Sequence, residues 1–240
     1  MPAAHPNTLT ALHLQGVRYA YPGATRTTLD LEALTLRGGE RVMLRGPSGC
    51  GKSTLLSLAA GVLVAQEGSV ELMGRDWATL RGAARDAHRV DHVGYIFQQF
   101  NLLPYLGVLD NVLLPCGFSR RRSQRAAAAH GSTRAAAVAL LDALELPAAA
   151  HQRPAAELSV GQQQRVAAAR ALIGQPDIVI ADEPTSALDE DRREAFMRLL
   201  LHAMQAGSAL LFVTHDARLA SHFDRVVDLP SINRAGVEVR

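Results

Sequence analysis

The chain has 240 residues, 48% of them hydrophobic and 20% charged, and its formal net charge is +2. This length suits one α/β domain with a sizeable apolar core, and so small a net charge does not indicate binding to nucleic acid or to an anionic membrane. No run approaches about 18 consecutive apolar residues, and the first ten residues do not resemble a secretion signal, so the composition predicts neither a membrane span nor a signal peptide.

Two predicted strands precede the main motif of the chain. Hydrophobic residues alternate over 12–17 and again over 29–36, which is typical of strands with one buried face. The turn between them carries Tyr19 and Tyr21, where an exposed ring could stack on a nucleobase or could simply pack the turn. A glycine-rich turn then leads into a third apolar strand over 42–44.

Residues 46–54 carry the strongest chemical pattern of the chain. An apolar run precedes them and another follows, so the context is strand, glycine-rich turn and helix, as the phosphate-binding pattern requires. Glycines let successive backbone N–H groups point at one anion, and the helix N-terminus adds positive potential. We predict that Lys52 reaches the β- and γ-phosphates of a nucleoside triphosphate and that Ser53 ligates Mg²⁺. The predicted loop consists of Gly46, Pro47, Ser48, Gly49, Cys50, Gly51, Lys52, Ser53 and Thr54.

After this loop, the pattern predicts a strand and a turn over 68–74, a charged helix over 80–91 and a buried strand over 94–97. His88 and His92 lie four residues apart, a spacing that could bind a metal ion on one helix face. No third ligand or carboxylate cluster accompanies them, so this spacing alone does not indicate a metal site.

The middle of the chain contains no clear strand. Residues 106–114 and 135–146 have the pattern of helices, and four prolines are expected to break the helical stretch. Within one domain that spans the chain, we predict a helical subdomain over about 99–156, inserted into an α/β core formed by 1–98 and 157–240. The prolines are Pro104, Pro115, Pro147 and Pro154.

A basic run interrupts the predicted helical subdomain. Such runs are usually solvated loops, and the alternative of binding a phosphate backbone stays open. The alanine-rich segments that follow the run reflect helix propensity rather than a function. The run consists of Arg120, Arg121, Arg122 and Arg125.

Two carboxylates end a buried strand that is predicted over 177–181. Ligands of open α/β sheets bind at the carboxyl ends of the strands. We predict that Asp182 holds Mg²⁺, mostly through water, and that Glu183 polarises the attacking water, whereas a helix-capping pair is the structural alternative. A further strand over 209–213 ends near His215, which could contact the γ-phosphate or could be an ordinary edge residue.

Residues 158–165, Leu-Ser-Val-Gly-Gln-Gln-Gln-Arg, resemble the signature sequence of the ATP-binding cassette (ABC) family. The resemblance covers roughly residues 12–229 and implies a P-loop NTPase core, mainly a parallel sheet with flanking helices. It also implies an antiparallel β subdomain and an inserted α-helical subdomain. The other family motifs are, in order, the aromatic Tyr21, the phosphate loop, the Gln98 loop, the signature, the acidic strand, the 186–189 loop Ser-Ala-Leu-Asp and the His215 switch.

The resemblance implies ATP and Mg²⁺ bound in a head-to-tail homodimer that sandwiches two ATP molecules. Each ATP would lie between the phosphate loop of one subunit and the signature of the other, where a helix over 160–174 begins and its N-terminus completes the anion site. Tyr21 would stack on adenine, Gln98 would reach Mg²⁺ or the attacking water, and Asp189 would help the two sites communicate. The implied catalytic residues are Glu183, His215, Gln98 and Lys52, the metal ligands Ser53, Gln98 and Asp182, and the signature contacts to ATP Ser159, Gly161 and Gln162.

One position departs from the family pattern, which has two glycines after the signature serine. Val160 replaces the first of them. Valine tolerates helical backbone angles, but its side chain fills space that glycine leaves open. We expect the replacement to be harmless, because Ser159, Gly161 and Glu183 are retained.

The two cysteines, Cys50 and Cys116, are far apart and match no zinc or disulfide pattern, which is typical of a protein in a reducing cytoplasm. Cys50 lies within the predicted phosphate loop. We therefore expect it to face that loop, so that a bulky thiol reagent would inhibit and ATP would protect.

The segment 97–104, followed by Asp110-Asn111-Val112, resembles the lipoprotein-releasing and macrolide-exporter branch of the family. This implies an ATP-hydrolysing subunit that powers a separate integral membrane permease and lies peripherally on the cytoplasmic face of the inner (plasma) membrane. The alternatives are an importer ATPase of the polar amino-acid type, whose glutamine loop is similar, and a cell-division type signalling ATPase that moves no substrate. The family's DNA and ribosome branches carry long insertions or a second cassette that this sequence lacks, so we expect no nucleic-acid partner.

Overall fold

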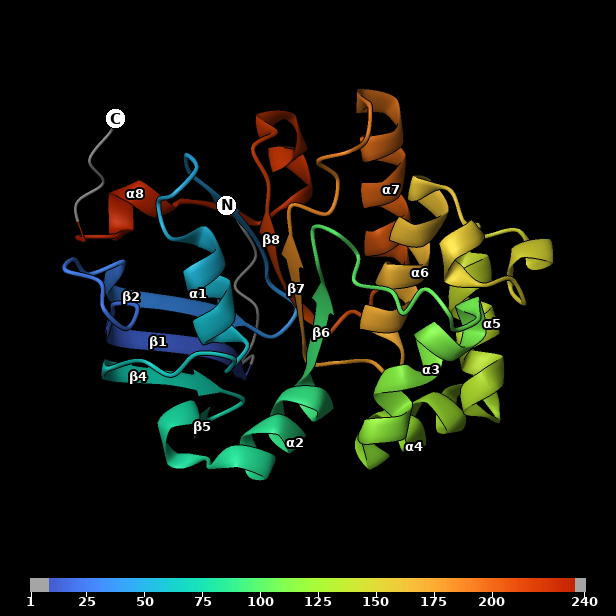
Figure 1. Cartoon of the computed structure of the whole chain (residues 1–240), viewed down its shortest axis with the longest axis horizontal. Coiled ribbons are helices and arrows are strands. Elements are labelled where there is room, and N and C mark those ends of the chain that lie inside the picture. Colours follow the sequence, from blue (N-terminus) through green and yellow to red (C-terminus); the bar gives the residue numbers. More distant parts are fainter. Residues whose placement is uncertain (1–8, 236–240) are drawn as a thin grey trace.

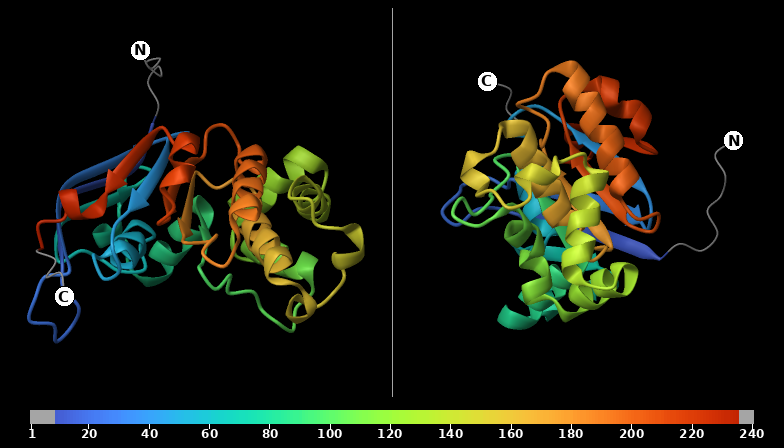
Figure 2. Two further views of the ribbon diagram at one scale, coloured as in Figure 1. Left: turned by 90° about the horizontal axis from the view of Figure 1, so that it is seen from above. Right: turned by 90° about the vertical axis from the view of Figure 1, so that its right-hand side faces the viewer.

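The structure is a computed structural model that describes residues 9–235. The expectation about a signal peptide in the first ten residues therefore lies almost entirely outside the described residues. An antiparallel sheet, a parallel sheet and a group of helices follow one another across the molecule (Figure 1). Seen from above, the helical group extends from the parallel sheet on the side away from the antiparallel sheet (Figure 2).

The parallel sheet forms the centre of the molecule. Its neighbouring strands all pair in parallel. Strands β7 and β8 are buried on both faces, which is why they read as continuous apolar runs in the sequence. The carboxyl ends of β6, β7 and β8 point to the same edge (Figure 1), and the loops that follow them carry predicted site residues. The spatial order is β6 (Val93–Ile96), β7 (Ile178–Asp182), β8 (Ala209–Val213), β3 (Arg41–Arg45) and β9 (Arg225–Asp228).

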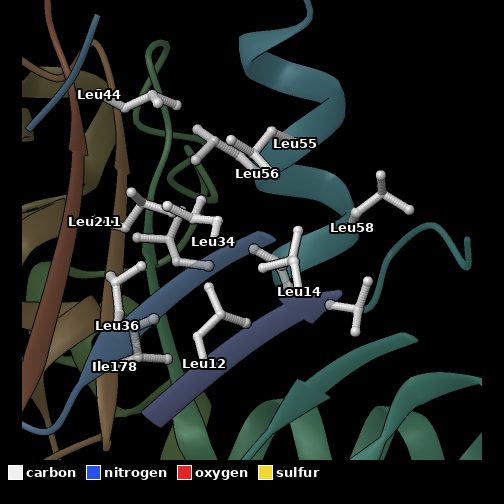
Figure 3. Packing of buried hydrophobic residues seen from close by; sticks show 14 of the residues in the cluster. Leu12, Leu14, Leu34, Leu36, Leu44, Leu55, Leu56, Leu58, Ile178 and Leu211 are labelled. Carbon is white, nitrogen blue, oxygen red and sulfur yellow. The ribbon is translucent and has the colours of Figure 1, made fainter. Parts of the chain in front are cut away.

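The antiparallel sheet covers helix α1 (Lys52–Ala59) and one face of the parallel sheet. Its spatial order is β2 (Leu29–Arg37), β1 (Thr10–Tyr19), β4 (Glu67–Leu72) and β5 (Arg75–Asp76). Alternating leucines of β1 and β2 point into a core shared with α1 (Figure 3), and burying each such side chain contributes about 1.5–3 kcal/mol. The leucines and isoleucine labelled in this core are Leu12, Leu14, Leu34, Leu36, Leu44, Leu55, Leu56, Leu58, Leu211 and Ile178.

A second apolar core lies on the opposite face of the parallel sheet. Successive residues of a strand point to opposite faces, and β7 accordingly divides between the two cores. Ile178 and Ile180 join the first core, whereas Val179 and Ala181 join the second. Helices that pack on the second core include α3 (Val108–Phe118), α5 (Thr133–Ala143), α6 (Val160–Leu172) and α7 (Glu190–Ala203).

The predicted fold class, an α/β architecture with an antiparallel sheet and a helical insertion, is confirmed by this arrangement. Residues 100–156, all of them described, contain helices and a single isolated β-bridge. The bounds of the helical subdomain stay a prediction. None of the described helices is long and apolar enough to cross a membrane. The remaining helices are α2 (Gly82–His92), α4 (Arg120–His130) and α8 (Leu229–Ile232).

Helix α3 corrects the expectation that Pro115 breaks the helical stretch. Proline in a helix interior removes one backbone donor and its bond to the residue four positions earlier. The helix nevertheless continues to Phe118, and the carbonyl of Pro115 accepts a bond from the N–H of Ser119 at 2.9 Å. Packing of α3 on the second core stabilises the helix across the lost bond, since most helix stability in proteins comes from tertiary packing.

The basic run is not a solvated loop. It forms the first turns of α4, and the side chain of Arg122 is buried against the carboxyl-terminal end of α6. Its guanidinium donates to the carbonyls of Ile173 at 2.7 Å and Ala171 at 2.6 Å. Two of the neighbouring arginines bind a carboxylate instead, that of Asp177. Because three of the four arginines are engaged within the protein, the run also offers little to a phosphate backbone.

The two histidines of α2 have structural partners. His88 lies 2.9 Å from the carbonyl of Leu72, and His92 lies 2.6 Å from the carboxylate of Asp177. Burial tends to raise the pKa of Asp177, but the hydrogen bond with His92 and the charge of Arg125 outweigh it and hold that pKa below its ordinary value. Among the described residues, no three or more His, Cys, Asp and Glu side chains are grouped so that they could hold a metal ion.

Candidate functional site

A cleft of about 340 Å³ lies at the carboxyl edge of the parallel sheet, where the loops after four strands meet. This edge is where open α/β sheets bind ligands. Each of these loops supplies at least one predicted site residue to the cleft. The lining residues are Thr28, Ser48, Gly49, Gly51, Lys52, Ser53, Thr54, Gln98, Asp182, Glu183 and His215.

The phosphate loop connects β3 to α1 through glycines with positive φ. Gly49 has φ +79° and Gly51 has φ +100°, angles that other residues adopt at a cost. Helix α1 begins immediately afterwards at Lys52, so its N-terminal N–H groups lie at the cleft. The Lys52 ammonium donates to the carbonyls of Gly46 at 2.9 Å and Pro47 at 3.0 Å. Loop and helix together form a site that favours anions.

Asp182 and Ser53 place oxygen ligands at one side of the cleft. Asp182 ends β7, and its carboxylate is hydrogen-bonded to Ser53. Burial raises the pKa of Asp182, the neighbouring Glu183 charge adds to that effect, and Lys52 opposes it. A hydroxyl, a carboxylate and the amide of Gln98 in the same cleft form the donor set that Mg²⁺ prefers, so the residues present fit this ion.

Glu183 is held in an unusual backbone conformation. Its φ is +44°, a region that costs a non-glycine residue about 1–3 kcal/mol and that concentrates at functional sites. The N–H of Glu183 donates to the carbonyl of Val213 at 3.1 Å, which joins the end of β7 to β8. Its carboxylate lies 2.6 Å from Nε2 of His215 and 3.7 Å from Nζ of Lys52. The predicted base, switch and phosphate-loop lysine therefore form one contiguous group.

The predicted adenine-stacking residue lies beside the cleft rather than in its lining. The Tyr21 hydroxyl is 3.2 Å from the hydroxyl of Thr54, and its ring packs edge-on against Tyr19 with centroids 5.2 Å apart. Because 45% of Tyr21 remains exposed, its ring is free to meet a planar ligand at the entrance.

Cys50 does not face the cleft. Only 1% of this residue is exposed, and its sulfur lies 2.7 Å from the position that a Cβ on Gly46 would occupy. The thiol therefore packs beneath the phosphate loop, which contradicts the expectation that a reagent could reach Cys50 from the cleft. Sequence position alone could not show that this one side chain of the loop points inward.

The signature residues lie outside the cleft of the same chain. Ser159 caps α6 in a reciprocal arrangement with Gln162. The N–H of Ser159 donates to the Gln162 side chain at 3.1 Å, and the Ser159 hydroxyl accepts from the N–H of Gln162. Val160 is the first helical residue and is 50% exposed, and a Cβ on Gly161 would meet only open space. Asp189 caps α7 by accepting from the N–H of Arg192. These residues present a helix N-terminus away from their own phosphate loop.

Sequence reasoning missed several residues at or near the site. Thr28 lines the cleft from the residue before β2, where no motif marks it. Arg193 of α7 contacts the carboxylate of Asp216 and donates to the carbonyl of Leu188 at 2.9 Å. It thus joins the 186–189 loop to the residue after His215. Hydrogen bonds from Arg218 and then Arg193 hold the pKa of Asp216 well below its usual range.

Comparison with known proteins places this site in a family. Residues 29–186 match the family described as ABC transporter. The chain is 38% identical over 219 residues to a macrolide export ATP-binding/permease protein MacB of Rhodopseudomonas palustris, covering 90% of this chain and 32% of that protein. It is 41% identical over 199 residues to an uncharacterized ABC transporter ATP-binding protein of Mycobacterium tuberculosis, covering 82% of this chain and 57% of that protein. The chain thus spans between a third and somewhat more than half of these relatives.

A solved structure agrees with the sequence comparisons. The ATP-binding cassette MJ0796, described as a dimer in a post-hydrolysis state bound to ADP and Pi, superposes with a TM-score of 0.80 and 34% sequence identity, covering 95% of this chain and 96% of that one. The predicted resemblance is therefore confirmed. With the phosphate loop, the acidic strand and the signature helix in these positions, the chain belongs to the ABC transporter family and contains its ATP-binding domain.

Proposed function

We propose that this chain hydrolyses ATP at the carboxyl edge of its parallel sheet and thereby drives a transporter, most closely of the exporter type. The convergence of Lys52, Gln98, Asp182, Glu183 and His215 on one cleft carries the proposal. Membership of the ABC transporter family and the resemblance to a cassette described with ADP and Pi support ATP as the substrate.

The residues divide the work of an in-line attack by water on the γ-phosphate. Lys52 and the loop N–H groups hold the phosphates, and Ser53, Asp182 and Gln98 would hold Mg²⁺, which supplies charge neutralisation when bound. Glu183 accepts the proton of the attacking water. His215 lies within hydrogen-bonding distance of Glu183, so it keeps that carboxylate oriented and can also contact the γ-phosphate.

The proposed working unit is a head-to-tail homodimer. Ser159, Gly161 and Gln162 lie at an exposed helix N-terminus outside the cleft of their own chain, so a second copy could add this positive end to the bound ATP. Tyr21 would stack on the adenine. The dimeric state named for the solved cassette supports this arrangement.

A separate integral membrane permease is the proposed partner, with the chain peripheral at the cytoplasmic face of the membrane. A groove of about 770 Å³ runs between the parallel sheet and the helical insertion, and exposed apolar side chains line it. Its lining includes Val62, Phe97 and Phe118, and Phe97 directly precedes Gln98 of the cleft. A permease segment seated here would lie next to a residue that contacts the nucleotide site.

The exporter type rests on the MacB relatives, which are named macrolide export ATP-binding/permease proteins and of which this chain covers about a third. The polar amino-acid type importer and the cell-division type signalling ATPase remain the alternatives. They differ in the permease that they require, which makes the partner the decisive observation.

The variant Glu183→Gln tests both parts of the proposal. It keeps the shape of the side chain and removes the base, so ATP turnover should fall by ~10²- to 10⁴-fold while ATP binding is retained. Glu67→Gln, an exposed exchange on the antiparallel sheet, is the matched control and should hydrolyse like the parent. Turnover of Glu183→Gln near the parental rate would remove Glu183 from this role.

The same ATP-bound variant, tagged and recovered from detergent-solubilised membranes, identifies the partner. Co-purification of a permease with few spans and a large external domain would support the exporter type. A permease with five or more spans would favour the importer alternative, and recovery of DNA or ribosomes instead would contradict transport.

A further inference from the structure

The carboxyl-terminal part of the described chain returns to the phosphate loop. Strand β9 pairs with β3, the strand that leads into this loop, and helix α8 follows directly. Pro230 of α8 lies 2.9 Å from the position that a Cβ on Gly46 would occupy. Asn233, just after α8, is only 8% exposed. The sequence carries no motif in this segment, and the roles proposed above do not use it.

The Asn233 amide joins three separate parts of the chain. Its Nδ2 donates to the carbonyl of Cys50 at 3.1 Å and to the carbonyl of Thr28 at 3.2 Å. Its Oδ1 accepts from the N–H of Asp30 at 2.9 Å and from the N–H of Ala235 at 3.1 Å. An asparagine amide offers two donor hydrogens and two acceptor sites, so its capacity is fully used. Carbonyls on one side and N–H groups on the other fix the orientation of the amide.

The bond to Cys50 has a consequence for the cleft, because the peptide unit between Cys50 and Gly51 is planar and trans. In such a unit the C=O and the N–H point in opposite directions. Holding the Cys50 carbonyl toward Asn233 therefore turns the Gly51 N–H away from Asn233. Gly51 lines the cleft, and its N–H has no acceptor within the described part of the protein.

Because residue 51 is a glycine, the peptide unit between Cys50 and Gly51 needs the hydrogen bond from Asn233 to keep its orientation. Gly51 has φ +100°, and glycine peptides rotate more freely than others, so a loop of this composition does not by itself fix the direction of each N–H. The contact with Thr28 adds a second anchor, since the carbonyl of Thr28 also lies 3.2 Å from where a Cβ on Gly51 would stand. Asn233 thus holds the loop through the Cys50 carbonyl, and it is not itself among the residues that line the cleft.

We propose that Asn233 is a positioning residue of the nucleotide site, which aims the Gly51 N–H at the phosphates of ATP by holding the Cys50 carbonyl. This inference rests on the proposed binding of ATP at the phosphate loop. It assigns a role in the site to a residue 183 positions from Cys50.

Two variants separate positioning from stability. Asn233→Leu has a similar volume and removes all four hydrogen bonds. Asn233→Asp keeps the acceptor for the N–H groups of Asp30 and Ala235, so the segment stays attached, but it loses the donors and adds a negative charge behind the phosphate loop. The control Arg234→Ala removes the neighbouring surface ion pair with Glu32 and leaves the amide intact.

For the full chain of each variant, the melting temperature is measured first. The dissociation constant for MgATP and the kcat and KM of ATP hydrolysis are then measured at a temperature at which every variant is folded. We expect Asn233→Leu to raise both the dissociation constant and KM about tenfold with kcat changed less than about threefold, because a loop N–H that binds the phosphates equally in ground and transition state affects binding uniformly. Asn233→Asp should bind MgATP more weakly still. Arg234→Ala should bind like the parent.

The outcomes distinguish this inference from the proposed function. If the parental protein binds no MgATP, the proposed function fails and takes the inference with it. If the parent binds MgATP and Asn233→Asp binds within about twofold of it, the inference alone is overturned, whatever the melting temperatures. A weaker binding in both Asn233 variants, with the Arg234→Ala control unchanged, supports it.

Discussion

Replacing Arg122 with methionine tests how the helical insertion is attached to the rest of the molecule. Methionine retains much of the aliphatic stem but none of the donors. In the structure the guanidinium donates to the carbonyls of Ile173 and Ala171 at the end of α6 and to the carbonyl of Val93 at the start of β6. Gly174 gives it access, because a Cβ there would stand 2.5 Å from the Cβ of Arg122.

Two opposing terms set the size of the effect. Each buried carbonyl that loses its partner costs about 1–3 kcal/mol, and three lose theirs. Against this, burial lowers the pKa of Arg122 to about 10, which means that its charge is disfavoured there by roughly 3 kcal/mol, and methionine removes that cost. The carbonyl term is the larger, so we expect Arg122→Met to lower the free energy of unfolding by about 2–4 kcal/mol.

Urea unfolding followed by circular dichroism measures this change, with Arg120→Met as the matched control. Arg120 starts the same helix but is exposed, and its replacement should change stability by less than about 0.5 kcal/mol. If Arg122→Met were as stable as the parent, the desolvation of the charge would be as large as the loss of its hydrogen bonds, and the reasoning would be refuted.

Two further predictions concern residues of the nucleotide site. Val160→Gly should leave steady-state ATP turnover within about tenfold of the parent, which corresponds to ~1.4 kcal/mol of barrier, because Val160 occupies an ordinary exposed position at the start of α6. A larger rise in turnover would show that the Val160 side chain obstructs the site. A bulky thiol reagent applied to the folded protein should leave Cys50 unmodified and should reach it only after denaturation. Mass spectrometry of the two cysteine-containing peptides measures this labelling. Rapid labelling of Cys50 in the native protein would contradict its burial.

The sequence predicts the centre of this fold well because local chemistry and position coincide there. The strand before the phosphate loop and those before Asp182 and His215 are apolar runs, and each is followed at once by the residues that do the chemistry. In a parallel sheet such ends must meet at one edge. The cleft was therefore predictable from the order of the motifs, and Thr28 is the one lining residue that no motif marks.

Residues that act through distant backbone groups could not be predicted in this way. Arg122 lies in a run of basic residues, a pattern that usually indicates solvent, and its partners are carbonyls about fifty positions later. Asn233 follows a short helix in a segment without any motif, and its partner carbonyl lies 183 positions away. Every residue has a backbone carbonyl, so nothing in the sequence marks which carbonyl will accept a hydrogen bond from a distant side chain.

The position of Arg122 links stability to the proposed dimeric site. It contacts the last turn of α6, and Ser159 caps the first turn of the same thirteen-residue helix, about 20 Å away. A tilt of roughly 3° at one end of a rod of this length moves the other end by about 1 Å. Because a displacement of that size can reduce a rate by ~10²-fold, Arg122→Met should lower ATP turnover in the folded protein while leaving ATP binding to the phosphate loop unchanged. Equal turnover in the folded variant and the parent would mean that the rest of the second core, without Arg122, suffices to hold α6 in place.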